Sequence, residues 1–435
     1  MKKFFNEEFE TMPLAQMQRF QQEALARTLE RVHAKVPYYQ RAFEVRGVKP
    51  TDLHRLEDLA RFPFTVKTAL RDNYPLGLCT VPPRELARIH ASSGTTGKPI
   101  TGPYTAADMQ QWGECMARAM WAQSVRPDDI AQNAYGMGLF TGGLGFLLGF
   151  ERVGCAVIPA GSGQTERQLL LMEDLGTTVL AATPTYALTI AERAMELGKD
   201  LTRFPLRVGL FGAEPWTPKM KALLEERMGI VAHEHYGLTE LMGPGVAFSC
   251  EAGRLHINED HIYAEVIDPE TEEPLPLGRP GELVLTSLQR EAMPMVRYRT
   301  RDITRLERTP CPCGRTSVAM EKVTGRSDDM MIVSGVNVFP SQIESVLMEF
   351  AEIEPQYVIH LYKKGYIDAI RVETEVKAAL YAKGGEFIST LAGRVADRIQ
   401  QVVGIKVPVA ILEGGAIPRS VGKAKRIIDE RAEIR

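Results

Sequence analysis

Hydrophobic positions recur at roughly helical spacing through residues 1–75. Met17, Phe20, Ala24 and Leu29 show this spacing, which places apolar side chains on one face of a helix. Prolines at positions 37 and 63 interrupt the pattern. The N-terminal region is therefore predicted to be helical.

From about residue 85 to 245, short apolar runs alternate with amphipathic stretches. The apolar runs are typical of buried strands, and the amphipathic stretches of helices that cover them. Such alternation predicts an α/β fold with a mainly parallel sheet and helices on its faces. The predicted strands are 130–134, 156–158, 179–182 and 208–211, and the predicted helices are 166–174, 186–197 and 218–228.

The pattern changes twice more. From about residue 262, alternating segments at 262–267, 281–286 and 303–306 stand between Pro/Gly-rich turns, which predicts a small antiparallel β-rich unit. After Gly325-Arg-Ser-Asp-Asp329, a strand at 330–333 and a helix at 340–350 begin a compact α+β series. We therefore predict a large N-terminal domain, 1–326, and a small mobile C-terminal domain, 327–435.

Composition adds several exclusions. The 435 residues exceed what one hydrophobic core usually organises. A net charge of −3 argues against a nucleic-acid partner, which needs a broad basic face. The longest apolar stretch, 136–150, is shorter than the roughly 20 residues of a membrane span, and the N-terminus turns acidic before any apolar segment develops. A cytoplasmic protein without a membrane partner is expected.

The segment Ser92-Ser-Gly-Thr-Thr-Gly-Lys-Pro99 is the first candidate for chemistry. Glycines allow tight turns that aim backbone N–H groups at an anion, while hydroxyls and Lys98 add further donors. An ordinary surface loop is the alternative. The spacing excludes a P-loop, and position 141 lacks the third glycine of a dinucleotide fingerprint. The predicted phosphate ligands are Ser92, Ser93, Gly94, Thr95, Thr96, Gly97 and Lys98.

Five further segments follow in order: Gly212-Ala-Glu214, Tyr236-Gly-Leu-Thr-Glu240, Tyr298-Arg-Thr-Arg-Asp302, Gly325-Arg-Ser-Asp328 and Pro418-Arg-Ser-Val-Gly-Lys423. Each alone has an ordinary structural explanation, such as a charged hairpin or a solvated lysine. Together with the loop they resemble the adenylate-forming superfamily, which includes acyl-CoA synthetases and peptide-synthetase adenylation domains.

The resemblance implies a role for each segment. Tyr236 would stack on adenine, Thr239 would meet the α-phosphate and Glu240 would hold Mg²⁺, for which a carboxylate is a suitable hard ligand. Asp302 and Arg326 would contact the ribose, and Lys423 would be the catalytic lysine. Asp328 would be the hinge between the domains. The other implied ATP-binding positions are Gly212, Ala213, Glu214, His235 and Gly237.

The flanking sequence resembles one branch, phenylacetate–CoA ligase. The segments that carry this likeness are 36–39, 62–67, 70–75, 336–344 and 417–426. The branch implies formation of an acyl-adenylate from ATP, then of an acyl-CoA thioester with release of AMP, in aromatic acid catabolism. Ser334 and Gly335 would line the CoA channel, although Ser334 stands where arginine is expected and Val421 where an acidic residue is expected. A homodimer is compatible with this branch.

Two other functions use the same motifs or part of them. A stand-alone adenylating enzyme that loads an aryl acid onto a carrier protein has the same fold and first step, but the flanks favour CoA. A non-catalytic ATP-binding protein is disfavoured because Glu240, Asp302 and Lys423 are all present.

The acid pocket is predicted from small and aromatic residues near the segments that line it in relatives, and these suit a flat aryl ring. Close packing would explain the glycines equally well. Phenylacetate is the predicted acid, with another aryl or arylacetic acid as the alternative. The candidates are Tyr135, Phe140, Gly142, Gly143 and Pro244, with Gly212 and Ala213 beside them.

A second candidate site consists of Cys250, His256, Cys311 and Cys313. Cys-x-Cys followed by glycine resembles half of a zinc knuckle, and Cys250 with His256 could complete a Cys3His tetrahedral site. Free thiols and a surface histidine are the alternative. Cysteine clusters in a cytoplasmic protein favour a metal over disulfides, so structural zinc is predicted.

Overall fold

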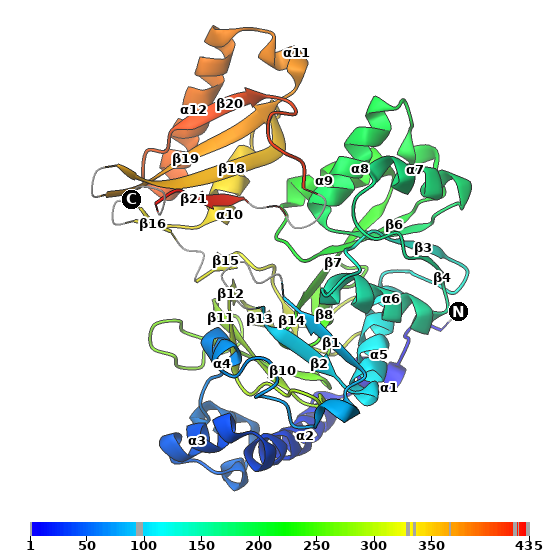
Figure 1. Cartoon of the computed structure of the whole chain (residues 1–435), viewed down its shortest axis with the longest axis vertical. Coiled ribbons are helices and arrows are strands. Elements are labelled where there is room, and N and C mark those ends of the chain that lie inside the picture. The colour runs from blue at the N-terminus through cyan, green and yellow to red at the C-terminus, as the bar shows by residue number, and fades with distance from the viewer. Residues whose placement is uncertain are drawn as a thin grey trace.

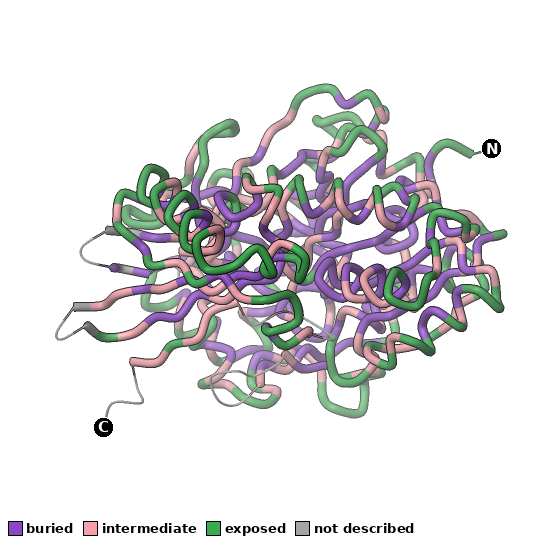
Figure 2. The backbone as a smooth tube through the Cα atoms, turned by 90° about the horizontal axis from the view of Figure 1, so that it is seen from above, coloured by how far each residue is buried: buried purple, intermediate pink, exposed green. Residues whose placement is uncertain are grey.

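The computed structural model describes residues 2–92, 99–327, 331–333, 336–364, 367–420, 424 and 426–431. Several predicted site residues lie outside these ranges: Ser93, Gly94, Thr95, Thr96, Gly97, Lys98, Asp328, Ser334, Gly335, Val421 and Lys423. Figure 1 shows a large part that contains the N-terminus and a smaller part, yellow to red, at the top of the view. In Figure 2 the buried backbone is concentrated in the interior of the large part.

The N-terminal region is helical, as predicted. Apolar side chains of α2, including Leu25, Leu29 and Val32, are fully buried. Pro37 ends α2 and starts α3, because proline lacks the N–H that would continue the first helix but suits the first turn of the next. The elements are α1 (Glu7–Glu10), α2 (Leu14–Lys35), α3 (Pro37–Arg46), α4 (Lys67–Asp72) and the 3₁₀ turns η1 (Pro50–Asp52), η2 (Leu56–Arg61) and η3 (Pro83–Glu85).

In the described ranges, nine strands form the main sheet, in the order β13-β14-β9-β8-β7-β6-β5-β3-β4. The pairs from β4 to β7 are parallel, which confirms the predicted parallel sheet, and those from β7 to β13 are antiparallel, which was not predicted. The strands are β3 (Ile130–Asn133), β4 (Ala156–Ile158), β5 (Val179–Ala182), β6 (Val208–Gly212), β7 (Val231–Leu238), β8 (Gly243–Ser249), β9 (Leu255–Ile257), β13 (Leu306–Glu307) and β14 (Ala319–Met320).

Helices cover both faces of the parallel half. Val179 and Ala181 of β5 belong to one hydrophobic cluster, and Leu180 and Ala182 to another, because successive side chains point to opposite faces. α5 and α6 cover the first face, and α7, α8 and α9 the second. The elements are α5 (Ala106–Ala122), α6 (Thr141–Val153), α7 (Thr165–Asp174), α8 (Pro184–Glu196), η4 (Leu201–Arg203) and α9 (Pro218–Met228).

The predicted β-rich unit is an antiparallel sheet of order β10-β11-β12-β15. One expectation is wrong: 303–306 is not a single strand. Thr304 ends β12 opposite Gly281, whereas Leu306 begins β13 in the main sheet, so the chain passes between sheets at Arg305. The strands are β10 (Ile262–Ile267), β11 (Gly281–Ser287), β12 (Tyr298–Thr304) and β15 (Gly325–Arg326), and a separate hairpin consists of β1 (Arg88–Ala91) and β2 (Thr101–Tyr104).

The C-terminal part has its own hydrophobic cluster, which draws on residues from Met331 to Ile411. Its larger sheet has the order β20-β19-β18-β21, and β16 and β17 form a hairpin. The helix predicted at 340–350 ends at Leu347. The elements are β16 (Met331–Val333), β17 (Val336–Val338), α10 (Pro340–Leu347), β18 (Ile353–Lys364), β19 (Ile367–Val376), α11 (Ala378–Tyr381), α12 (Gly385–Val403), β20 (Val409–Glu413) and β21 (Ile427–Asp429).

No helix in the described ranges combines the length and the apolar character that a bilayer crossing requires.

Candidate active site

The predicted phosphate loop connects β1 and β2. Ser92 lies in the described part and closes the base of the loop: its N–H donates to Ile100 O at 2.8 Å, and its Oγ accepts from Ile100 N at 3.0 Å. Ala91 N donates to Leu139 O at 2.9 Å, which ties the hairpin to the segment before α6. A strand-to-strand loop agrees with the exclusion of a P-loop, which joins a strand to a helix.

Three of the predicted nucleotide ligands meet where β7 of the main sheet approaches the β10-β11-β12-β15 sheet. Tyr236 Oη donates to one carboxylate oxygen of Asp302, and Arg326 Nη1 donates to the other at 3.1 Å. Asp302 of β12 is paired with Arg326 of β15, whereas Tyr236 comes from β7. Burial and the Asp302 charge raise the pKa of Tyr236, so the phenol stays a donor. This cluster joins segments that are 66 and 24 residues apart in sequence.

Glu240 is a buried carboxylate that accepts a hydrogen bond from Tyr298 Oη at 3.2 Å. Burial and the charge of Glu240 raise the pKa of Tyr298, which therefore remains protonated. Among the described side chains, no lysine or arginine forms an ion pair with Glu240. Thr239 Oγ1 lies 3.3 Å from Thr141 Oγ1 at the start of α6. A buried carboxylate with no cationic partner among the described residues fits a cation ligand.

Arg290 holds the Glu240 segment and was missed from the sequence. Its Nη1 donates to the carbonyl oxygens of Glu240, at 2.7 Å, and Leu241. Its Nη2 donates to Pro103 O at 3.1 Å, and the guanidinium lies 4.6 Å from the centre of the Tyr104 ring. Because its partners are backbone carbonyls remote in sequence, no motif around Arg290 marks this role.

The segment Gly212-Ala-Glu214 follows β6. A Cβ at Gly212 would lie 2.4 Å from His235 O, so only glycine fits there. Ala213 has a positive φ of 71°. The carboxylate of Glu214 accepts from Thr185 N at 2.8 Å and from Ala424 N at 3.0 Å. Both oxygens of Glu214 are thus engaged by backbone N–H groups, one of which belongs to the C-terminal part.

His235, a predicted ATP contact, points its side chain into the protein. Its Nε2 lies 2.7 Å from Gln123 Oε1, and its ring packs edge-on against Phe146 with centroids 4.8 Å apart. At Gly237, a Cβ would lie only 1.8 Å from Gly243 O, which makes glycine obligatory at this close approach of β7 and β8. Because the His235 side chain is buried and contacts Gln123, any contact of His235 with ATP would have to come from its backbone, and that role stays a prediction.

The predicted acid-pocket residues cluster only in part. Tyr135 is buried and stacks on Phe146, with centroids 4.7 Å apart. A Cβ at Gly142 would lie 3.6 Å from the Tyr135 ring, whereas a Cβ at Gly143 would lie 2.5 Å from Gly136 O. Gly143 therefore has a packing role. Phe140 is 48% exposed, and Pro244 O accepts from Trp112 Nε1 at 2.6 Å.

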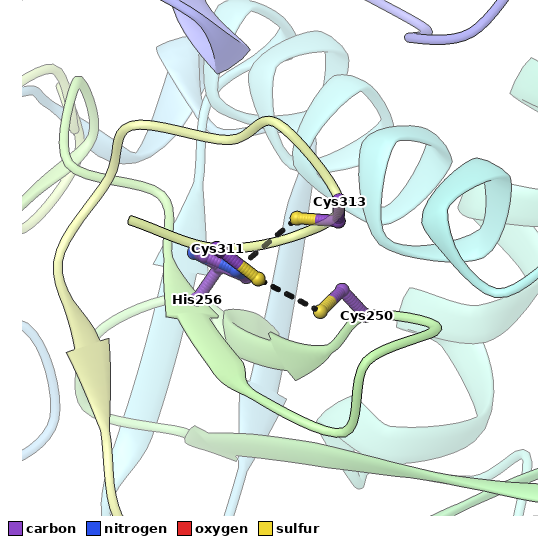
Figure 3. Close-up of side chains that lie close together, drawn as sticks. All are labelled: Cys250, His256, Cys311 and Cys313. Carbon is purple, nitrogen blue, oxygen red and sulfur yellow. Dashed lines mark hydrogen bonds between the residues drawn. The ribbon is translucent and has the colours of Figure 1, made fainter. Parts of the chain in front are cut away.

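The four predicted zinc ligands lie together. Cys250 follows β8, His256 is on β9, and Cys311 and Cys313 are in the loop between β13 and β14 (Figure 3). Their ligand atoms all lie within 4.8 Å of one another. Cys250 Sγ is 3.7 Å from Cys311 Sγ, and Cys313 Sγ is 3.5 Å from His256 Nε2. With ordinary zinc bond lengths, a tetrahedral site requires about 3.8 Å between two sulfurs and about 3.6 Å between sulfur and nitrogen.

The surroundings of His256 also suit a metal ligand. Its Nδ1 lies 3.3 Å from Ser317 O, which can only accept a hydrogen bond, and 3.2 Å from Ser317 Oγ, which can donate or accept. With the proton on Nδ1 and donated to Ser317 O, the lone pair of Nε2 faces Cys313 Sγ, 3.5 Å away. This is the arrangement in which an outer hydrogen bond fixes the tautomer of a metal-binding histidine.

Comparison with known proteins agrees with this site. The family model of the AMP-binding enzymes matches residues 15–289, and that of the AMP-binding enzyme C-terminal domain matches residues 335–431. The phenylacetate–coenzyme A ligase of Aromatoleum evansii is 45% identical over 420 residues, with 96% of this chain and 95% of the relative covered. That of Escherichia coli K12 is 44% identical over 426 residues, with 97% of each chain covered.

A solved structure, 2-hydroxyisobutyryl-CoA ligase, is 28% identical and covers 99% of this chain and 93% of its own. Its postadenylation state with 2-HIB-AMP superimposes with a TM-score of 0.93. Its thioesterification state, with 2-HIB-AMP and CoA, is 29% identical with the same coverage and a TM-score of 0.74. Fold, clustered nucleotide motifs and nearly full-length similarity lead to one conclusion: this chain belongs to the AMP-binding, adenylate-forming enzymes and, among them, to the phenylacetate–coenzyme A ligase family.

Proposed function

We propose that this chain is an ATP-dependent ligase that converts phenylacetate into phenylacetyl-CoA through a phenylacetyl-adenylate. The observation that carries the proposal is the Tyr236–Asp302–Arg326 cluster beside the buried Glu240, in a chain 45% identical to a phenylacetate–coenzyme A ligase. Carboxylate attack on the α-phosphate releases pyrophosphate in the first step, and attack by the CoA thiol releases AMP in the second.

In the first step the protein supplies position and electrostatic stabilisation. Asp302 and Arg326 bind the ribose, and Tyr236 lies against the adenine. Glu240 would hold Mg²⁺, and its buried carboxylate without a described cationic partner fits that role. Magnesium supplies positive charge beside the phosphates. Thr239 contacts the α-phosphate. Lys423 lies between the α-phosphate and the carboxylate of the acid and interacts with both.

In the second step the domains 1–326 and 327–435 change their relative position about Asp328. Lys423 then leaves the site, and Ser334 and Gly335 line the CoA channel. This alternation is supported by the similarity of the structure to one state of 2-hydroxyisobutyryl-CoA ligase, TM-score 0.93, over the other, 0.74. One active site can serve two half-reactions when the domains exchange faces.

The acid would lie near Tyr135, Phe140 and Gly142. Two aromatic rings beside a residue without a side chain suit a flat aryl group. Loading of a carrier protein remains the competing second step. Dimerisation through the N-terminal domain remains a prediction that size-exclusion chromatography with light scattering would test.

The test is ATP–pyrophosphate exchange with a panel of aryl, arylacetic and aliphatic acids, with and without CoA. Phenylacetate should support the fastest exchange, and CoA should be required for release of AMP. Lys423→Ala should lose exchange while it still converts supplied phenylacetyl-adenylate and CoA into thioester. If none of the acids supports exchange in the wild type, the ligase function is refuted. If release of AMP requires a carrier protein instead of CoA, carrier loading is favoured.

We also propose that Cys250, His256, Cys311 and Cys313 bind a structural zinc ion. The interatomic distances support this, as does Ser317 O, a carbonyl that can accept the Nδ1 proton of a histidine bound to metal through Nε2. Zinc would tie the loop that follows β13 to the β8–β9 turn and stabilise this end of the main sheet.

Elemental analysis of purified protein should find about one zinc per chain, and the variant Cys311→Ser/Cys313→Ser should lose it along with several degrees of Tm. The matched control is Cys79→Ser/Cys155→Ser, which alters two cysteines outside the cluster and should retain the metal. A wild type without zinc after purification in zinc-containing, chelator-free buffer would contradict the proposal.

A further inference from the structure

The two parts of the chain meet through a line of alternating charges. Arg227 of α9 lies 3.7 Å from Glu354 of the C-terminal part and 3.8 Å from Glu192 of α8. Glu192 in turn accepts a hydrogen bond from Arg419 Nε at 3.3 Å, and Arg419 Nη1 donates to Glu375 at 2.9 Å. The Glu354–Arg227 and Glu192–Arg419 pairs therefore cross the interface.

The charges of this line are largely shielded from solvent. The side chains of Glu192 and Arg227 are 20% and 14% exposed, and that of Glu375 is fully buried. Glu375 also accepts from the backbone N–H groups of Gly415 and Ile417, which fixes the turn that carries Arg419. Ion pairs at such sites are screened less by salt than exposed pairs are.

A groove of about 960 Å³ runs beside these pairs, between α7 and α8 on one side and residues of the C-terminal part on the other. It is lined mostly by polar and charged side chains, including Glu192 and Arg419. An interface that is open here and held by polar contacts can separate without exposing a large apolar surface.

Glu214 makes another contact across the interface. One of its oxygens accepts from Thr185 N at the start of α8, and the other from Ala424 N, at 2.8 and 3.0 Å respectively. Ala424 directly follows Lys423 in the sequence, and Arg419 precedes Lys423 by four residues. The described residues on both sides of the catalytic lysine are thus bonded to α8 or to the turn before α9.

We propose that Glu214 and Glu192 are positioning residues that hold Ala424 and Arg419, which flank Lys423 in the sequence, against the N-terminal domain and so select the arrangement in which Lys423 acts. This inference rests on the proposed ligase function. The structure is more similar to the postadenylation arrangement of 2-hydroxyisobutyryl-CoA ligase than to its thioesterification arrangement, which is consistent with contacts that form before the second half-reaction and break for it. Both glutamates must release their partners before the second half-reaction.

The sharpest variant is Glu214→Gln. It keeps the shape of the side chain, but one oxygen is replaced by an NH₂ group that faces an N–H donor, so one of the two bonds is lost. Glu192→Gln removes the charge that pairs with Arg419. Hydrogen bonds to charged groups of this kind justify an expected loss of about tenfold to a hundredfold in the kcat of ATP–pyrophosphate exchange for each variant.

The side-chain oxygens of Glu214 are bonded to backbone N–H groups, so its predicted ATP contact would come from its backbone and survive Glu214→Gln. Glu192 lies outside the predicted ATP and acid sites, and KM for ATP and phenylacetate should therefore stay unchanged in both variants. Thioester formation from supplied phenylacetyl-adenylate and CoA should be as fast as in the wild type or faster. The control is Glu196→Gln on the same helix, whose ion-pair partner Arg193 is also on that helix and whose side chain is 63% exposed. This variant should exchange like the wild type.

The inference is overturned if Glu214→Gln and Glu192→Gln slow adenylation and thioester formation equally. It is also overturned if both variants exchange as fast as Glu196→Gln. A lower Tm with parallel losses would show that Glu214 acts only as a structural cap of α8. If the wild type supports exchange but the variants do not differ from it, the positioning role fails and the ligase function stands. If none of the acids supports exchange in the wild type, the ligase function itself fails.

Discussion

His233 and His235 lie on β7 directly before Tyr236, and both are buried. Burial lowers the pKa of His233 to about 4, with a smaller contribution from Lys221. Burial, with the neighbouring His233, lowers the pKa of His235 to about 3. Both rings are therefore neutral in the folded protein near neutral pH, which suits packing, such as that of His235 against Phe146 of α6, and not proton transfer.

These shifts predict a pH dependence of stability. The unfolded chain binds protons near pH 6.5 while the folded chain does not, so the free energy of unfolding should fall as the pH decreases from about 6.5 towards 4. The expected slope is up to about 1.4 kcal/mol per pH unit for each histidine. Urea unfolding at pH 7, 6 and 5 measures it.

The variant His235→Gln isolates one of the two contributions, because glutamine can still donate to Gln123 but does not titrate. Its stability should depend less steeply on pH than that of the wild type. His54→Gln, which removes a histidine at an exposed position, is the control. An unchanged slope in His235→Gln would contradict the assignment.

At the level of elements, the packing of α5 on α6 depends on glycine. A Cβ at Gly149 would lie 2.6 Å from Met116 Cβ and 2.7 Å from Met120 Cε. The Met120 end can move, but Met116 Cβ is fixed to the backbone of α5. The two helices can approach this closely only because α6 has no side chain at Gly149.

Gly149→Ala should therefore destabilise the protein although alanine favours helices by about 1 kcal/mol. Overpacking costs about 1–3 kcal/mol, so the net free energy of unfolding should fall by up to about 2 kcal/mol. Gly113→Ala on α5 is the control, since its Cβ would meet Leu148 O at an ordinary 3.6 Å. It should be neutral or stabilising in urea unfolding, and equal stability of the two variants would contradict the packing argument.

Elements were predictable where their signals are local. The strand at Val179–Ala182 and the helix at Pro218–Met228 have the predicted bounds, because one is a short buried apolar run and the other starts with a Thr-Pro cap. Strands β9, β13 and β14 have two or three residues each, too few for any periodicity. The antiparallel half of the main sheet was therefore invisible in the sequence.

At the scale of the whole molecule, the proposed two-step reaction depends on how the two parts sit relative to one another. Arg419 and Ala424 reach Glu192 and Glu214 across the interface, over 227 and 210 residues of chain. We therefore expect a change at these contacts to alter the balance between the two half-reactions, without altering a side chain that touches substrate. Half-reaction assays are therefore more informative than overall turnover.

The sequence alone determined the chemistry that is available: residue types such as Tyr236, Asp302, Arg326 and Glu240 in a fixed order, and the Cys3His set. Local patterns also determined the parallel half of the sheet, because hydrophobic period and helix caps are short-range properties.

Only the tertiary structure decided which groups meet. It brought Tyr236 and Arg326 to one carboxylate, set Arg290 on the carbonyls of Glu240 and Leu241, and gave Glu214 a partner in the other domain. Such contacts depend on distances between remote segments, and backbone N–H and carbonyl partners are present at nearly every residue, so they leave no mark in the sequence.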